Sequence, residues 1–356
     1  MLTFEKREST PLRVRTLVPL GSVVLGLVIG AVVMLFSRIN PIRVYAAVVK
    51  GSVGSWYAFT ETVAIAIPLI LIATGLALVF RMRFLNIGAM GQYIIGALCG
   101  SWFALFGPPM PRPLLLTAMM LAGAAGGAIW AVIPALLKVK WQVNEVIATL
   151  LLNYVAEFIL KFLIFGIWRD PFSYGFPLSK TFAISAQLPR LFAPPSRVHV
   201  GLVFALVAAC VVWVVIRKTR FGYEGRVIGE NDRAARYAGI NIVRTVLIAA
   251  AVSGGLAGLA GIAHIAGYTR LVQQNFGFNW GYTAIIVTWL ASLDPLIAIG
   301  VAMFLACIEA GGYQIQIAMR VPFGIVSVIE SSILFALLAC EILTNYRVRL
   351  ARRSRT

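Results

Sequence analysis

The side chains that could do chemistry in this sequence are carboxylates, amides and aromatics placed within long apolar runs. Of the 356 residues only 12% are charged, and the only histidines are His199 and His264. The sequence has no Gly-Lys dipeptide, hence no G-x-x-x-x-G-K-[ST] loop for ATP, and no H-E-x-x-H or nucleophile-elbow pattern. Four scattered cysteines without a C-x-x-C pair predict neither a disulfide nor a metal site. We therefore expect no catalytic residue and no enzyme.

Ionisable residues within the apolar runs are candidates for a polar pathway, because a charge in a bilayer must face protein or water. Glu157 and Lys161 lie four residues apart, a spacing that favours a salt bridge over a substrate contact. Glu309 and Glu330 are better pathway candidates, with hydrogen bonding between helices as the alternative. Together with amides of the segments 86–92 and 144–153, the residues predicted to line a polar pathway are Asn86, Gln92, Asn144, Glu145, Asn153, Glu309 and Glu330.

Residues 273–280, with the sequence QQNFGFNW, interleave amides with aromatics. Amides can hydrogen-bond hydroxyls or base edges, and aromatic faces can stack on sugars or nucleobases, so the segment suits a neutral polar solute. The alternative is a belt of aromatic residues at the membrane interface. The predicted outer contacts are Asn275, Phe276, Phe278 and Trp280.

Several other residues in the runs are predicted to serve packing. We expect His264 to hydrogen-bond a neighbouring helix instead of binding a metal ion. The spacing of Gly254 and Gly258, and of Gly123 and Gly127, is typical of helices that approach one another closely.

The composition is that of a membrane protein. Hydrophobic residues make up 60% of the chain, and its mean hydropathy is +0.89, whereas soluble proteins carry about twice this share of charged residues. The net charge of +18 comes from 31 Lys and Arg against 13 Asp and Glu. We attribute it to basic loops on the cytoplasmic side of a bilayer, and not to nucleic-acid binding.

Ten apolar runs predict an all-α fold of about ten transmembrane helices. The first is long enough to be a retained helix and not a cleaved signal peptide. The eighth is short for a crossing and is expected to be re-entrant or broken. The runs cover residues 17–36, 62–80, 87–106, 114–137, 143–167, 198–216, 245–266, 281–293, 296–313 and 322–343.

The distribution of Lys and Arg predicts that both termini are cytoplasmic, because segments assigned to that side carry about twice as many basic residues. We expect a cytoplasmic tail at 1–16, one transmembrane domain at 17–346 and a basic cytoplasmic tail at 347–356. Runs two to five and seven to ten would then have opposite orientation, as inverted repeats do.

The longest predicted cytoplasmic loop, residues 217–244, contains the signals of a short helix. Asn231 or Asp232 can cap its start, residues 233–238 favour a helix, and Gly239 can end it. A helix of two turns is marginal in water. Capping at both ends therefore indicates a partner surface; the alternative is a basic loop that serves only orientation.

The spacing R-x-x-G-x-N-x-x-A-A-x-x-x-G-I in this loop resembles the ATPase-coupling loop of bacterial ATP-binding-cassette (ABC) importer permeases of the ribose and nucleoside branch. Its order of segments is most similar to the nucleoside type, from about residue 20 to 345. The predicted coupling residues are Arg226, Gly229, Glu230, Asn231, Asp232, Ala234, Ala235, Gly239 and Ile240.

Two further segments carry the resemblance. Residues 86–92, NIGAMGQ, resemble that branch's N-I-G-x-E-G-Q signature, and residues 144–153, NEVIATLLLN, resemble its N-E-V-I-x-T-L-M-L-N helix. Met90 stands where relatives usually have Glu, which puts any role of that acid in doubt here.

The resemblance implies a multi-pass subunit of the bacterial cytoplasmic (inner) membrane that moves a small polar solute, a nucleoside above all. A simple sugar such as ribose is the first alternative, and an ATP-independent secondary transporter or facilitator is the second. Implied partners are an ABC ATPase with ATP and Mg²⁺, a second and non-identical permease, an extracytoplasmic solute-binding protein or lipoprotein, and membrane lipid. In this picture the ATPase pulls on the loop helix and rocks the spans between outward-open and inward-open states.

Overall fold

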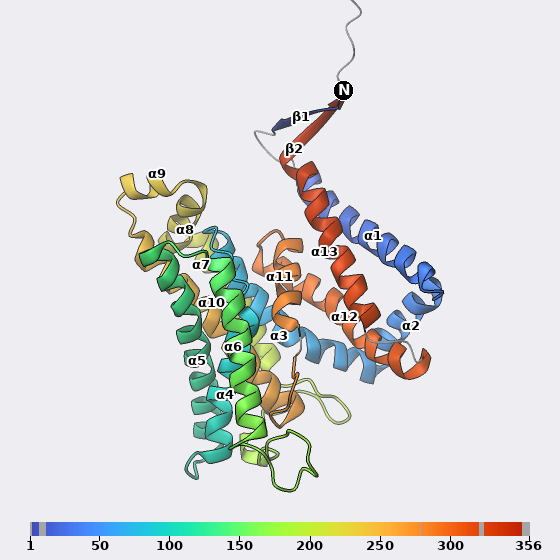
Figure 1. Ribbon diagram of the computed structural model, residues 1–356, viewed down its shortest axis with the longest axis vertical. Coiled ribbons are helices and arrows are strands. Elements are labelled where there is room, and N and C mark those ends of the chain that lie inside the picture. Colours follow the sequence, from blue (N-terminus) through green and yellow to red (C-terminus); the bar gives the residue numbers. More distant parts are fainter. Residues whose placement is uncertain (1, 7–11, 278, 320–323, 351–356) are drawn as a thin grey trace, which may run out of the picture. The chain divides into compact units, whose positions relative to one another are not determined.

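The computed structural model describes residues 2–6, 12–277, 279–319 and 324–350, which are mostly helical (Figure 1). The helices are α1 (Leu12–Phe36), α2 (Pro41–Val53), α3 (Trp56–Phe80), α4 (Ala89–Phe106), α5 (Arg112–Trp141), α6 (Glu145–Phe165), η1 (Ile184–Ala186), α7 (Gly201–Lys218), α8 (Arg220–Glu230), α9 (Asp232–Tyr237), α10 (Ile242–His264), η2 (Ile265–Thr269), α11 (Trp280–Leu290), α12 (Pro295–Met319) and α13 (Gly324–Asn345). Strands β1 (Leu2–Lys6) and β2 (Tyr346–Leu350) pair in an antiparallel sheet. The chain divides into two compact units, Met1–Ser55 with Cys307–Thr356, and Trp56–Ala306.

Each of the ten predicted apolar runs coincides with a helix. Among the residues described, seven helices are long and apolar enough to cross a membrane, and three further apolar stretches are shorter: Leu20–Phe36, Trp280–Leu290 and Ser327–Leu337. The expectation of a multi-pass helical membrane protein is therefore confirmed. The inverted repeat and the cytoplasmic placement of both termini stay predictions.

The eighth run forms the short helix α11, as its length predicts. Its 11 residues extend about 17 Å, against a hydrocarbon core of about 30 Å. The π-helical turn η2 and a loop precede it, and the turn 291–294 follows it before α12 begins at Pro295. Helix α11 packs against α3 and α4, so neighbouring helices shield an element too short for a full crossing.

The centre of the larger unit is the packing of α10 against α3, α4 and α5. Glycines permit the close approach: a Cβ on Gly127 would collide with Gly254 and Gly258, and one on Gly258 would collide with the carbonyl oxygen of Gly123. These are the glycines that the sequence predicts for close packing, and that prediction is confirmed.

The turn that joins α11 to α12 is held by two arginines. Ser292 and Leu293 both have positive φ, 53° and 61°, which is strained for residues with a side chain. Arg81 at the end of α3 donates from Nη2 to the Leu293 carbonyl oxygen at 3.0 Å. Asp294 caps α12 through the backbone N of Leu296 at 3.0 Å, and its Oδ2 lies 2.6 Å from Nη2 of Arg217.

The smaller unit is built on α1 packed against α13, the blue and red helices of Figure 1. A Cβ on Gly26 of α1 would collide with the backbone of Ile333 in α13. Strand β1 continues this pairing with β2, with Leu2 opposite Leu350 and Lys6 opposite Tyr346.

Helices α2 and α8 and the sheet of β1 and β2 were not predicted from the apolar runs. Helix α2 starts with a recognisable signal, because the Asn40 side chain accepts hydrogen bonds from the backbone N of Ile42 and Arg43, and Pro41 occupies the first position. Helix α8 contains three glycines, and the sheet joins segments from opposite ends of the sequence. These last two depend on tertiary contacts.

Candidate functional site

The short helix predicted in the loop 217–244 is present as α9, with a defined start and end. The Asn231 side-chain oxygen accepts hydrogen bonds from the backbone N of Arg233 at 2.9 Å and of Ala234 at 3.3 Å. Gly239 follows the helix with φ of +72°, and its N donates to the Arg236 carbonyl oxygen at 3.0 Å. The predicted helix, its N-cap and its glycine stop are confirmed.

Two glycines of the coupling motif, Gly229 and Gly239, are required for different structural reasons. A Cβ on Gly229, in α8, would collide with the carbonyl oxygen of Arg81, so α8 rests directly on the backbone at the end of α3. Gly239 has no atom within 4 Å of the same position. Its requirement is the left-handed backbone conformation that ends α9.

Helix α9 has one buried and one exposed side. Ala235 and Ile240 are buried against this chain, with 0% and 9% of their surface exposed. Tyr237 is 94% exposed and projects from the tip of the helix. The remaining coupling candidates on the surface are Arg226, Glu230, Asn231, Asp232, Ala234 and Gly239.

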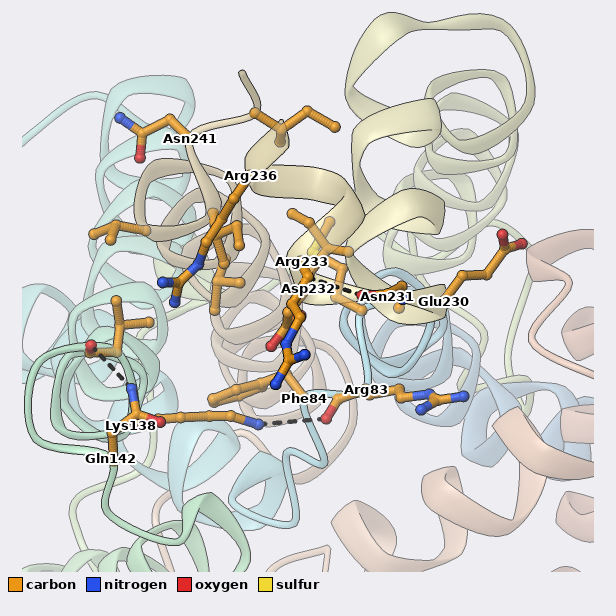
Figure 2. A pocket seen from close by; sticks show the side chains of 18 residues that line it. Arg83, Phe84, Lys138, Gln142, Glu230, Asn231, Asp232, Arg233, Arg236 and Asn241 are labelled. Carbon is orange, nitrogen blue, oxygen red and sulfur yellow. Dashed lines mark hydrogen bonds between the residues drawn. The ribbon is translucent and has the colours of Figure 1, made fainter. Parts of the chain in front are cut away.

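A groove of about 920 Å³ lies beside α9, between α5, α8, the start of α10 and the segment that follows α3. Four basic residues line it, and two acidic residues, Glu230 and Asp232, offset them only in part. Figure 2 shows the side chains of Arg233 and Arg236 pointing into the groove, while that of Glu230 points away. The basic residues of the lining are Arg83, Lys138, Arg233 and Arg236.

Two pathway candidates lie near this groove and stabilise it. Glu145 forms an ion pair with Lys138, whose Nζ also donates to the Arg83 carbonyl oxygen at 3.4 Å. Asn144 caps α6 by accepting hydrogen bonds from the backbone N of Val146 at 2.9 Å and of the next residue at 3.4 Å. Both side chains thus fix the junction of α5 and α6.

Asn86 and Gln92 lie together as a buried amide pair. Asn86 Nδ2 donates to Gln92 Oε1 at 3.0 Å, and Gln92 Nε2 donates back to Asn86 Oδ1 at 2.9 Å. Neither residue exposes more than 1% of its surface. The pair fixes the turn into α4, because each amide satisfies the other away from solvent.

Asn153 connects α6 to α4 and α11. Its Oδ1 accepts from the backbone N of Gly91 at 2.8 Å, and its Nδ2 donates to the Ile87 carbonyl oxygen at 3.0 Å and to the Tyr282 hydroxyl at 3.1 Å. Every polar atom of this side chain is therefore engaged, and its exposure is 4%.

Two of the predicted outer residues, Phe276 and Trp280, belong to an aromatic cluster around Tyr93. Phe276 stacks on Tyr93 with 5.4 Å between ring centroids, and Trp280 meets the edge of Tyr93 at 6.3 Å. The Tyr93 hydroxyl is hydrogen-bonded to Nδ1 of His264, which confirms the predicted bond of His264 to a neighbouring helix. Asn275 is exposed, and Phe278 lies outside the described residues.

The last two pathway candidates belong to the smaller unit. Glu309 lies on α12 and is 5% exposed, and Glu330 lies half-buried on α13.

The predicted salt bridge on α6, in the larger unit, is confirmed: Lys161 Nζ and Glu157 Oε1 are 2.6 Å apart.

Sequence patterns missed a polar cluster at the start of α3. Tyr268 donates to Glu61 Oε2 at 2.8 Å, and Arg197 Nε lies 3.5 Å from Glu61 Oε1. His199 is fully buried beside Gly201, whose backbone N donates to its Nδ1 at 3.1 Å. Burial lowers the pKa of His199 to about 4. The residues of this cluster are far apart in the sequence, so no local pattern predicts that they meet. The one available signal is that Glu61 and Arg197 lie at the edges of apolar runs.

A family model described as the permease component of a branched-chain amino acid transport system matches residues 58–340. That range contains the loop helix, the amide pair and the short helix α11.

Three curated relatives cover nearly the whole chain. It is 33% identical to the glucose ABC transporter permease protein TsgB13 of Haloferax volcanii, over 98% of this chain and 94% of that protein. It is 30% identical to the nucleoside ABC transporter permease protein NupB of Lactococcus lactis, over 90% of each chain. It is 29% identical to the guanosine ABC transporter permease protein NupP of Bacillus subtilis, over 94% of each.

Proposed function

We propose, since this chain belongs to the family of permease components of branched-chain amino acid transport systems, that it carries a nucleoside across the cytoplasmic membrane as one permease of an ABC importer. The energy comes from ATP and Mg²⁺ bound by a separate ATPase subunit. Family membership favours this ATP-driven hypothesis over an independent facilitator.

The observation that carries the proposal is the exposed side of α9 next to a cationic groove. A helix of 6 residues is marginal in water, yet α9 is capped at both ends and buries Ala235 against its own chain. The other side chains of α9 are exposed. Among them, Arg233 and Arg236 line the groove beside the helix. A partner with acidic side chains fits this surface, because opposite charges steer and orient docking.

This surface is the docking site for the ATPase. Movement of the ATPase on binding nucleotide displaces α9, and α8 transmits the displacement to α3 through the contact of Gly229 with Arg81. The complete importer contains, in addition, a second and non-identical permease and an extracytoplasmic solute-binding protein, in a bacterial cytoplasmic membrane.

A simple sugar is the second candidate substrate. The observation that favours it is the 33% identity to a glucose permease, the highest identity of the three relatives described. Uptake of labelled guanosine and labelled glucose by the same reconstituted importer decides between the two classes.

The test replaces Arg233 and Arg236 together by Glu in the complex of both permeases, the ATPase and the binding protein, reconstituted in liposomes. We expect ATP-driven uptake to fall more than about tenfold, because two favourable charge contacts become repulsive. Gly239→Val, which disturbs the end of α9, is expected to have a similar effect. Arg244→Glu is the matched control, since Arg244 is exposed nearby and does not line the groove.

Undiminished uptake by the double variant and by Gly239→Val would show that this loop does not couple. Uptake by the purified chain alone, abolished by dissipating the ion gradient and indifferent to ATP, would instead support a secondary transporter.

A further inference from the structure

Helix α6 carries a charged pair where a membrane helix is expected to be apolar. Glu157 lies twelve residues after the start of α6 at Glu145, which is about 18 Å along a helix that crosses a core of about 30 Å. The side chains of Glu157 and Lys161 are 37% and 33% exposed in this chain. Charges at that depth face protein or water and not lipid, so this side of α6 is turned away from the hydrocarbon.

A shallow pocket opens on the same side of α6. Its polar lining comes from three elements: Asn153, Tyr154 and Glu157 of α6, Asn275 and Asn279 of the loop before α11, and Tyr282 of α11. Met90 and Phe276 are among the apolar residues that complete the wall. The space is about 50 Å³, enough for a hydroxyl-bearing edge of a solute but not for a whole nucleoside, since a water molecule occupies about 30 Å³.

The Tyr282 hydroxyl is positioned to donate a hydrogen bond into this pocket. It accepts from Asn153 Nδ2 at 3.1 Å, and the other bonds of Asn153 to Ile87 and Gly91 hold that amide in place. Its own proton has no acceptor within the described part of the chain. Asn153 is therefore a positioning residue, while Tyr282 and one oxygen of Glu157 are available to a ligand.

The two asparagines of the loop are held with their amides unused. Asn275 and Asn279 have positive φ of 60° and 69°, and Phe276 between them is anchored on Tyr93. Asn279 precedes α11 in the N-cap position and makes no side-chain capping bond. Neither amide makes a hydrogen bond with the residues that the structure describes, although an amide offers both donors and an acceptor.

We propose, on the basis of the function proposed above, that this pocket binds the hydroxyl groups of the transported solute. The Glu157 and Lys161 charges cancel, so the lining presents a phenol, amides and a paired carboxylate to an uncharged ligand. Neighbouring hydroxyls of a sugar ring both donate and accept, which matches this set of groups. Tyr282, Asn279 and Glu157 contact the hydroxyls, and the second permease closes the open side of the pocket.

The experiment compares solutes with and without those hydroxyls in the reconstituted importer. Uptake of guanosine is measured against 2′,3′-dideoxyguanosine, and that of glucose against 2-deoxyglucose, for the wild type, Tyr282→Phe, Asn279→Ala and Glu157→Gln. The preference of the binding protein is the same for every variant and cancels in the comparison. Tyr174→Phe is the matched control, because Tyr174 is 99% exposed in a loop away from the pocket.

We expect the preference for the hydroxylated solute to fall about threefold to tenfold in the three pocket variants, the effect of one lost hydrogen bond. The control is expected to keep the wild-type preference. An unchanged preference in all three variants would overturn the proposal, even if uptake or assembly of the complex declines.

Direct binding separates this inference from the proposed function. If the wild-type importer shows no ATP-driven uptake of either solute, the proposed function fails; equilibrium dialysis of guanosine and glucose against the purified chain then tests the pocket. Weaker binding by Tyr282→Phe than by the wild type would support the pocket in that case, and equal or absent binding would reject it.

Discussion

The backbone of Gly229 packs so closely on the carbonyl oxygen of Arg81 that no side chain fits between them. The contact joins the loop that carries α9 to the end of α3. Since the side chain of the same arginine holds the turn before α12, one residue contacts both the loop and the turn between α11 and α12.

Gly229→Ala is expected to destabilise the protein by about 1–3 kcal/mol, because the added methyl group forces α8 away from α3. Thermal unfolding of the purified complex measures the loss, and uptake assays measure the expected uncoupling. Gly300→Ala is the control, since no atom lies within 4 Å of a Cβ at Gly300 in α12. The control is expected to be neutral or slightly stabilising; equal behaviour of the two variants would contradict the close contact.

Asn86→Leu is expected to cost about 1–3 kcal/mol of stability, because it leaves the buried Gln92 amide without its partner. Replacing both amides by Leu should cost less than the sum of the two single changes, which a double-mutant cycle on thermal unfolding detects. Additive losses would show that the two amides do not depend on one another. Uptake by properly assembled double variant then tests whether either amide also serves transport.

Asp294→Asn is expected to keep the cap of α12 but to lose the charged contact with Arg217. The expected loss of stability is about 1.5–3 kcal/mol, the range for a hydrogen bond to a charged group. Arg220→Ala serves as the comparison, since Arg220 is 88% exposed and pairs with Glu224; such a surface pair contributes about 0–1 kcal/mol. A loss no larger than that of the comparison would argue that the ion pair of Asp294 with Arg217 does not hold the turn.

Stability is expected to decrease as the pH falls from about 6.5 towards 4, because of His199. Its pKa is lowered from 6.5 to about 4 in the folded chain by burial, so the unfolded chain binds the proton first. The full effect is on the order of 3 kcal/mol. His199→Asn should unfold at temperatures that differ less between pH 7 and pH 4.5 than those of the wild type. An equal pH dependence of the wild type and the variant would show that groups other than His199 cause the loss of stability.

Local chemistry explains what could be predicted from the sequence. The boundaries of α9 follow from the Asn231 cap and the Gly239 stop, both of which act within a few residues. The length of each apolar run, compared with the thickness of the bilayer core, predicts the length of a helix, and the short eighth run corresponds to the short helix α11.

Features that depend on distant contacts could not be predicted in this way. Gly222, Gly225 and Gly229 disfavour a helix by propensity, yet α8 forms because each glycine allows a close backbone or side-chain contact. The ion pair of Glu61 with Arg197 joins the first turns of α3 to the loop before α7. The sequence identifies Asn86 and Gln92 only as polar residues in a membrane segment. The structure is needed to show that their amides hydrogen-bond to one another.

The pairing of β1 with β2 places Leu2 directly opposite Leu350. A short flexible linker could therefore connect the two strands, and new ends could be opened in the exposed loop around Tyr174. Such a circular permutant would begin in the middle of the membrane domain, which makes the order of helix insertion an experimental variable.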